Sequence, residues 1–125
     1  MKTIRWWSVV ILFLLPLIAH GQSAPFYQSH FPPEEFKARW QKAFDQIGDR
    51  AIAIFQGAPK ANGFIFPRQS NEFYYLCGIE TPHAYLLLDG RTRKVSLFLP
   101  PRDEALERAE GRILSSDDAE QVKRL

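Results

Sequence analysis

The sequence has little cysteine, no block of charge of one sign and only scattered glycine. Its single cysteine, Cys77, cannot form an internal disulfide, so a disulfide-stapled miniprotein is excluded and stability must come from packing. Sixteen Lys and Arg residues stand against 14 Asp and Glu without a basic run, which leaves no electrostatic footprint for nucleic acid. Seven glycines without a repeat exclude a collagen. What is present, 46% hydrophobic and 24% charged residues, is typical of a folded globular domain.

Only one long apolar run occurs, and it lies at the N-terminus. Lys2 and Arg5 precede the run at residues 6–18, and small residues follow it, which is the pattern of a signal peptide cleaved before Gln22. As a helix the run would span about 20 Å, less than the roughly 30 Å of a bilayer core, so no stable membrane anchor is expected. We therefore predict a signal peptide at residues 1–21 and an exported product, periplasmic or extracellular.

The rest of the chain suffices for one domain, at residues 33–125, preceded by an N-terminal arm at residues 22–32. Prolines and glutamates at residues 32–35 predict the start of a helix, which ends at Gly48. The apolar residues of this helix recur at intervals that place them on one face: Phe36, Trp40, Ala43, Phe44 and Ile47. We expect this face to pack on a sheet of the same domain; a stripe that binds a partner is the alternative.

Four short apolar runs predict strands. The run at residues 51–55 is almost entirely apolar, so we expect a strand covered on both faces, and residues 64–66 predict a second strand. Residues 85–88 and 95–99 predict two more, joined by a loop that opens with Asp-Gly and is typical of an antiparallel hairpin.

Two helices are predicted at the C-terminal end. Residues 103–110 have helix-forming composition up to Gly111, and Ser116 to Asp118 predict an N-cap and first turn of a helix that runs to Leu125. A helix of about two turns without a C-cap is marginal alone, so we expect a domain that is incomplete at its C-terminus.

Residues that could carry chemistry are scarce. The histidines, at positions 20, 30 and 83, are not spaced as metal ligands, and no metal site is predicted. The pairs Glu34–Glu35 and Asp117–Asp118 lie at helix starts, where interaction with the helix dipole explains them. Cys77 lies within an apolar run and is expected to be a small buried hydrophobe rather than a nucleophile. No catalytic residue is predicted in this chain.

One region is unusual. Residues 67–79 read PRQSNEFYYLCGI, a polar turn followed by three aromatics and a glycine; Pro82 and Ala84 then lead into a strand, and residues 97–103 read LFLPPRD. These blocks resemble the signature of the N-terminal domain of the creatinase, prolidase and aminopeptidase P superfamily, over residues 33–125. The departures are Cys77, where Thr or Ser is usual, His83, where a polar or acidic residue is usual, and Ala109, where many members carry Trp.

The resemblance implies a small α/β domain with a mixed sheet, placed ahead of a catalytic domain of the pita-bread fold and here truncated before it. That catalytic domain would hold two divalent metal ions, usually manganese, on two Asp, one His and two Glu, none of which maps onto this chain. The implied activity of the whole protein is removal of the N-terminal residue from proline-containing peptides, by a metal-bridged hydroxide. A homo-oligomer is also implied.

Arg68 and Tyr74 are the candidates for residues that control substrate access in such a protein. Tyr74 is expected to be exposed, with Phe73 and Tyr75 buried; a turn-stabilising arginine and a core tyrosine are the structural alternatives. Two further functions stay open: a dipeptidase of the prolidase type or a noncatalytic relative, and a free-standing secreted binding module that uses the aromatic cluster as its ligand surface.

Overall fold

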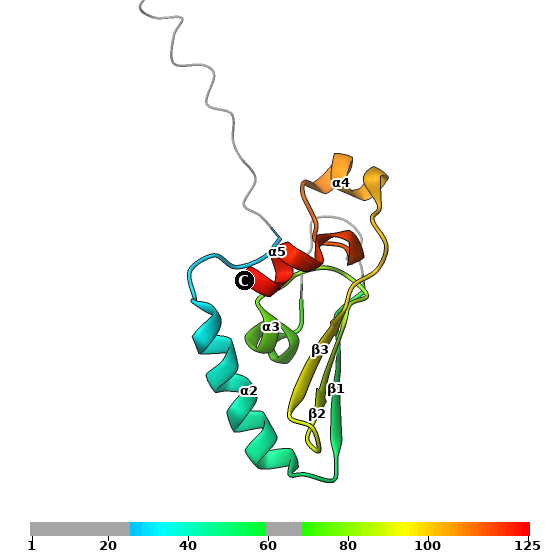
Figure 1. The fold of residues 1–125 in the computed structure, drawn as a ribbon. Helices are drawn as coiled ribbons and strands as arrows, with labels where there is room; N and C mark the ends of the chain where they lie inside the picture. Colours follow the sequence, from blue (N-terminus) through cyan, green and yellow to red (C-terminus); the bar gives the residue numbers. More distant parts are fainter. Residues whose placement is uncertain (1–25, 60–68) are drawn as a thin grey trace, which may run out of the picture.

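The structure, a computed structural model, describes residues 26–59 and 69–125 (Figure 1). The predicted signal peptide, the predicted strand at residues 64–66 and Arg68 lie outside the described residues. The elements in chain order are α2 (Pro33–Ile47), β1 (Ile52–Gln56), α3 (Asn71–Cys77), β2 (Tyr85–Asp89), β3 (Lys94–Phe98), α4 (Glu104–Glu110), the 3-10 helix η1 (Ser116–Asp118) and α5 (Ala119–Arg124). None of the described helices has the length and apolar character needed to cross a membrane.

The described strands form one antiparallel sheet in the order β1-β2-β3. The predicted hairpin is confirmed: β2 pairs with β3, with Leu88 opposite Val95. On its other side β2 pairs with β1, although α3 separates them in sequence, and Leu88 lies opposite Ala53. Among the described strands β2 is therefore central, and β1 and β3 are the outer strands.

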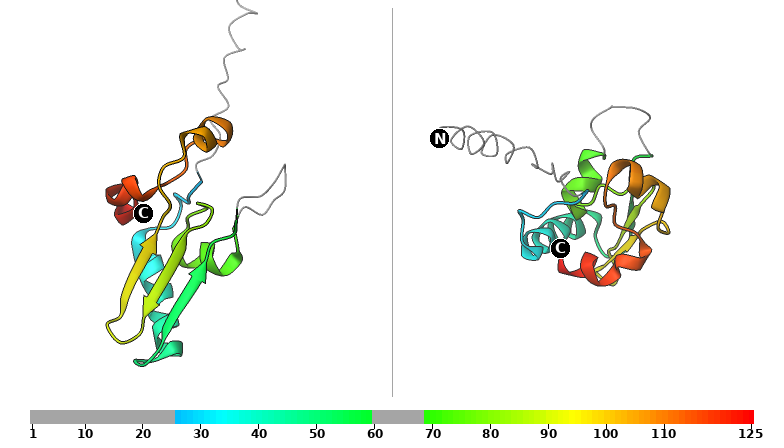
Figure 2. Two further views of the ribbon diagram at one scale, coloured as in Figure 1. Left: turned by 90° about the vertical axis from the view of Figure 1, so that its right-hand side faces the viewer. Right: turned by 90° about the horizontal axis from the view of Figure 1, so that it is seen from above.

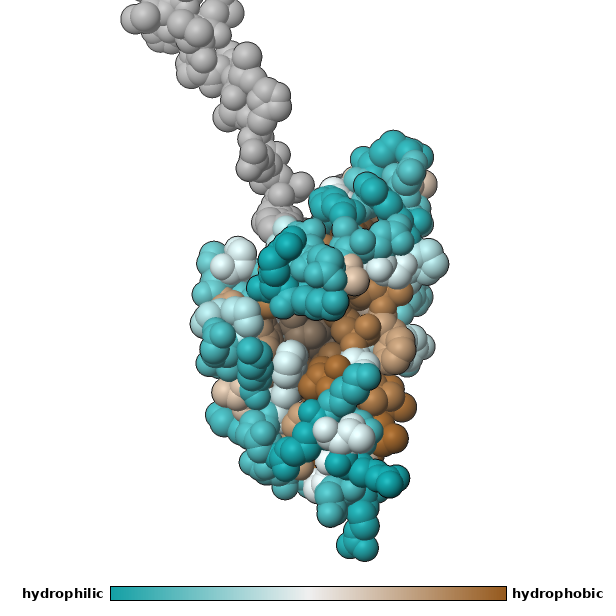
Figure 3. Space-filling model, viewed as in Figure 1, coloured by the Kyte–Doolittle hydropathy of each residue, from teal (hydrophilic) through white to brown (hydrophobic). Residues whose placement is uncertain are grey.

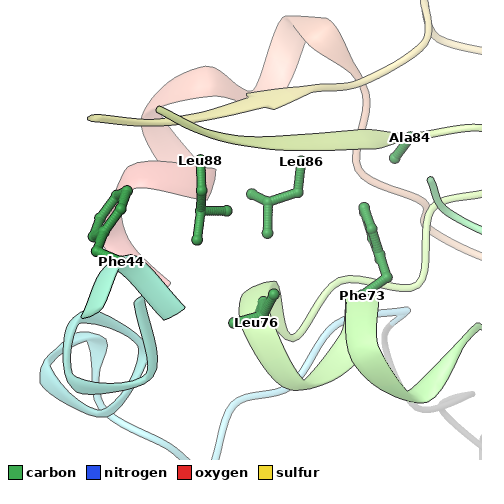
Figure 4. Close-up of a cluster of buried hydrophobic side chains, with 6 residues drawn as sticks. All are labelled: Phe44, Phe73, Leu76, Ala84, Leu86 and Leu88. Atoms are coloured by element: carbon green, nitrogen blue, oxygen red, sulfur yellow. The ribbon is translucent and has the colours of Figure 1, made fainter. Parts of the chain in front are cut away.

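One face of the sheet packs against α2 and α3, and Figure 2 shows the sheet with α2 behind it. Side chains alternate along a strand, so Leu86 and Leu88 point toward the helices. Figure 4 shows the buried core between sheet and helices, made by Phe44, Phe73, Leu76, Ala84, Leu86 and Leu88. The predicted apolar face of α2 is confirmed, because Trp40, Ala43 and Ile47 pack against this core.

The expectation that β1 is covered on both faces is wrong. Ile52 and Ile54 are 60% and 64% exposed, because no described element covers the outer face of the sheet. Only Ala53 and Phe55, at the alternate positions, pack against the helical layer. An almost entirely apolar run in the sequence does not distinguish a strand covered on both faces from a strand covered on one face.

The aromatic run folds as the helix α3, which ends at Gly78. Gly78 has φ +66° and donates its N–H to the Tyr74 carbonyl at 2.7 Å. Residues three apart share a helix face, so Phe73 and Leu76 are buried while Tyr75 is 49% exposed. The expected burial of Tyr75 is therefore wrong, and Tyr74 is half-buried rather than fully exposed.

The helix predicted at residues 103–110 is confirmed as α4, and Asp103 caps it by accepting from the Leu106 N–H at 2.9 Å. The cap of the last helix lies one residue earlier than predicted. Ser115, not Ser116, forms a capping box with Asp118, and the first turn is 3-10 rather than α.

The turn of the β2–β3 hairpin lies against the loop that joins α2 to β1. The Gly90 N–H donates to the Ala51 carbonyl at 3.0 Å. A Cβ at Gly90 would overlap the Gly48 carbonyl oxygen and lie 2.9 Å from the Ala51 oxygen. Only glycine allows this close approach.

Candidate functional site

The two ends of α3 are held by buried glutamine side chains. Gln69 accepts from the N–H groups of Ala58 and Ser70 and donates to the Thr81 carbonyl at 3.3 Å, so it joins the exit of β1 to the start of α3. Gln28 binds both backbone groups of Phe31, and its aliphatic stem lies where a Cβ on Gly78 would be. These contacts explain the glutamine that follows Arg68 in the first motif and the glycine that ends the aromatic motif.

Tyr74, the described candidate for substrate access, lies on α3 between these two supports. Its side chain is half-buried. Burial, and then electrostatic interaction with Glu80 and Cys77, raises the pKa of the Tyr74 phenol above its ordinary value. Tyr74 is therefore a neutral aromatic with a hydroxyl at neutral pH, suited to contact an apolar group but not to act as a nucleophile.

Cys77 lies three residues after Tyr74, at the end of α3, and its thiol has a raised pKa. Burial raises the pKa of its thiol to about 12, and its Sγ contacts the Phe73 carbonyl oxygen at 3.1 Å. A thiol with this pKa is almost fully protonated at neutral pH. The prediction was a small buried hydrophobe rather than a nucleophile; Cys77 is partly rather than fully buried, and its raised pKa agrees with a thiol that is not a nucleophile.

The sequence did not predict a cluster in which one arginine, Arg39, lies among three aromatic rings. The Arg39 guanidinium lies 4.7, 5.0 and 4.5 Å from the ring centres of Phe31, Phe36 and Tyr75. It also donates to the Tyr75 carbonyl at 2.8 Å and to Glu35 at 3.0 Å. The only signal in the sequence was a charged residue three positions after Phe36, on the apolar face of the helix.

Replacement of Arg39 by alanine is expected to lower the free energy of unfolding by about 2–3 kcal/mol. The change removes three cation–π contacts and leaves the Tyr75 carbonyl without its donor. Arg39→Lys should lose about half as much, since an ammonium cannot stack and donate in the same way. Urea denaturation measures both, with the exposed neighbour Lys42→Ala as the control. A loss below about 0.5 kcal/mol for Arg39→Ala would contradict the assigned role.

A chain of ion pairs joins α4 to the last helix. Arg112 binds both Glu107 and Asp118, and Arg102 binds Glu107 at 2.8 Å. The hydrogen bond from Arg112, opposed by partial desolvation and aided by Arg102, lowers the pKa of Glu107. Partial burial raises the pKa of Asp118, but the hydrogen bonds from Ser115 and the charge of Arg112 outweigh it, so the net direction is down. These ion pairs connect α4 to the start of the last helix.

Acidification should therefore weaken the ion pairs of Arg112 with Glu107 and Asp118 before it affects the sheet. A carboxylate with a lowered folded-state pKa stabilises the fold above its unfolded pKa, about 4, and this stabilisation is lost as pH falls through the folded-state pKa. We expect the Ser115 N–H, which donates to Asp118 at 2.9 Å, to exchange faster below about pH 4 relative to the amides of β2. Amide exchange from pH 6 to 3 measures this, with Asp118→Asn as the reference. A constant ratio of the two exchange rates would contradict the prediction.

A hollow of about 1020 Å³ lies between α2, β3 and α5. Figure 3 shows apolar residues gathered over β3 in this groove, bordered by hydrophilic ones. Ala119, Val122 and Leu125 of the last helix line it together with Trp40. The described residues contain no group of three His, Cys, Asp or Glu that could hold a metal ion.

The three comparisons with known proteins agree with this fold. Residues 36–124 match the family described as "Aminopeptidase P, N-terminal domain". The chain is 37% identical over 101 residues to the Xaa-Pro aminopeptidase of Haemophilus influenzae, a match that covers 76% of this chain and 24% of that protein. A probable Xaa-Pro aminopeptidase of Pyricularia oryzae is 33% identical over 88 residues, 66% of this chain and 17% of that protein.

Solved structures give the same result. Aminopeptidase P from E. coli in its low pH form superposes with a TM-score of 0.61 at 28% identity and covers 75% of this chain and 23% of its own. The same enzyme with the inhibitor Pro-Leu gives a TM-score of 0.59 at 29% identity, over 74% and 23%. The α/β domain defined by this fold is that of the aminopeptidase P N-terminal family, to which this chain belongs. The chain spans about a quarter or less of the length of these relatives.

Proposed function

We propose that this chain serves as the N-terminal, non-catalytic domain of an exported, metal-dependent Xaa-Pro aminopeptidase, which removes the N-terminal residue that precedes proline. The family match over residues 36–124 carries the proposal. The identity of 37% to a protein named Xaa-Pro aminopeptidase supports this activity over that of a prolidase-type dipeptidase.

The two divalent metal ions of such an enzyme, manganese by the resemblance, do not fit the described part of this chain. It offers no cluster of three His, Cys, Asp or Glu. Stable binding of a catalytic pair of ions needs several fixed carboxylate or imidazole ligands. The proposal therefore places the metal in a catalytic domain of the longer protein.

This domain would contribute to substrate access through Tyr74 and Arg68. The half-buried phenol of Tyr74 is fixed by α3 and stays neutral at neutral pH, so its ring offers an apolar surface to a proline ring, which has no N–H to satisfy. Arg68 precedes Gln69 by one residue in the sequence and is part of the proposal through the family resemblance of its motif. The homo-oligomer remains part of the proposal.

Export is the part of the proposal that rests on residues 1–21. The mature protein should begin at or near Gln22. The intact mass of the exported protein measures this. A membrane fraction that retains residues 1–21 would contradict cleavage.

Activity is tested on the protein purified from cells that express the natural gene. Manganese-dependent release of alanine from Ala-Pro-Ala, but not from Ala-Ala-Ala, by a polypeptide that contains this sequence is the expected result. Tyr74→Ala should raise KM about tenfold with a smaller change in kcat, because it removes a contact made in substrate binding. Tyr85→Ala, on the outer face of the sheet, is the matched control. Hydrolysis of the dipeptide Ala-Pro alone would favour the prolidase type, and a free, inactive chain would favour a binding module.

A further inference from the structure

The arm that precedes α2 is part of the folded domain from Phe26 on. The Phe26 side chain is buried, and its carbonyl oxygen accepts from the Glu80 N–H at 2.9 Å. Tyr27 pairs with Ile79 in an isolated antiparallel bridge. The arm therefore lies as a short extended segment against the connection between α3 and β2.

The arm also contacts α5 and the end of α3. The Gln121 side-chain amide donates to the Tyr27 hydroxyl at 3.0 Å, and Figure 1 shows the start of the arm beside α5. The Gln28 N–H donates to the Gly78 carbonyl at 2.8 Å. Loss of the first residues of this arm would thus remove contacts to three separate parts of the fold.

Only four residues separate Phe26 from the N-terminus that the proposed cleavage creates. Gln22 would come first, followed by Ser23, Ala24 and Pro25, which lie outside the described residues. General aminopeptidases stop before a proline, because its fixed φ and its missing N–H do not suit their sites. The proposed Xaa-Pro activity removes that barrier at the Ala24–Pro25 bond. Stepwise removal of residues could then proceed up to the arm.

A glutamine at the N-terminus can close this route by its own chemistry. The α-amine nitrogen of Gln22 attacks the side-chain amide carbon Cδ, so that a C–N bond forms and the Cδ–Nε2 bond breaks. Nε2 leaves as ammonia and takes one proton from the α-amine. The reaction is intramolecular and forms a five-membered lactam, so it needs no oxidant and no co-reactant. The product, pyroglutamate, lacks the free α-amine that aminopeptidases bind.

We propose that Gln22 is a modification site: the exported protein carries pyroglutamate at its N-terminus, and this cap protects the arm from stepwise removal. The inference rests on the export step of the proposed function, because cleavage before Gln22 is what frees its α-amine. Formation of the ring does not depend on catalysis by the longer polypeptide.

Mass spectrometry of the natural gene product tests the cap. Trypsin cuts after Lys37, so the N-terminal peptide spans residues 22–37 whatever the length of the polypeptide. We expect most of this peptide to be lighter by one ammonia. A synthetic peptide of residues 22–37 with a free α-amine, taken through the same preparation, should stay mostly uncyclised.

Each other result of this measurement contradicts the inference in a distinguishable way. Equal cyclised fractions in the protein and in the synthetic peptide would overturn a cap formed before handling. A free α-amine on Gln22 would overturn the cap and leave the export step intact. A start at any other residue would overturn both.

Gln22→Asn is the matched control. Its side chain keeps the amide but is one methylene shorter, so attack by the α-amine would close a strained four-membered ring, and the amine should stay free. With a general aminopeptidase and an Xaa-Pro aminopeptidase added together, the variant should lose residues 22–24 about tenfold faster than the unchanged protein, which lacks the charged amine. Pyroglutamyl peptidase, which removes the ring, should abolish this difference. Equal rates of loss before that treatment would overturn the protective role.

Discussion

Replacement of Phe73 by alanine should lower the free energy of unfolding by about 3–5 kcal/mol. Phe73 is fully buried, and its ring lies between α3 and the sheet, next to Ala84 (Figure 4). Alanine would leave a cavity in the core that joins the helical layer to β2, and the flanking backbone is held by Gln69 and cannot collapse into it freely. Urea or thermal denaturation measures the loss.

Two further variants keep this prediction testable if Phe73→Ala does not fold. Phe73→Leu retains most of the volume and should cost about 1–1.5 kcal/mol. Ile54→Ala removes a large apolar side chain that is 64% exposed and should cost less than about 1 kcal/mol. Equal losses for Phe73→Leu and Ile54→Ala would contradict the position of the core on one face of the sheet.

Replacement of Gly90 by alanine should cost about 3 kcal/mol or more, which is exceptional for a substitution in a turn. The added Cβ would overlap the Gly48 carbonyl oxygen, which belongs to the backbone and cannot rotate away as a side chain would. The hairpin turn would have to move off the α2–β1 loop, and the hydrogen bond from Gly90 to the Ala51 carbonyl would lengthen.

The control for Gly90 is its neighbour. Arg91→Ala lies in the same turn, removes an exposed side chain and should change stability by no more than about 0.5 kcal/mol. A second readout is the Gly90 amide, which should lose its protection from exchange in Gly90→Ala only. A loss of less than 1 kcal/mol for Gly90→Ala would mean that the two loops do not approach as described.

The elements with a clear period or turn signal could be predicted from the sequence. In α2, apolar residues at helical spacing and the flanking Pro33 and Gly48 agree on the element, its ends and its buried face. The hairpin was predictable because Asp89 and Gly90 open a loop between two apolar runs.

The aromatic helix and the surfaces around it were harder to predict. Three consecutive aromatics in α3 have no period, so the burial of alternate residues was the natural expectation, and only a helix explains why Tyr75 is exposed and Leu76 buried. The Arg39 cluster joins Tyr75 of α3 to residues 31–39, which are distant from it in sequence, and the groove exists only once α2, β3 and α5 are placed. Local patterns carry no information about such contacts.

Native-state amide exchange of the chain tests most directly the claim on which the rest depends, that a three-stranded sheet has one covered face and an open edge at β3. Residues 85–89 have ladder partners on both sides and should be the best protected, with exchange near the rate set by global unfolding. In β3, alternate amides should exchange much faster than their neighbours, because those that point away from β2 have no partner strand within residues 26–59 and 69–125. Uniform protection along residues 94–98, equal to that of residues 85–89, would contradict the open edge and the groove beside it.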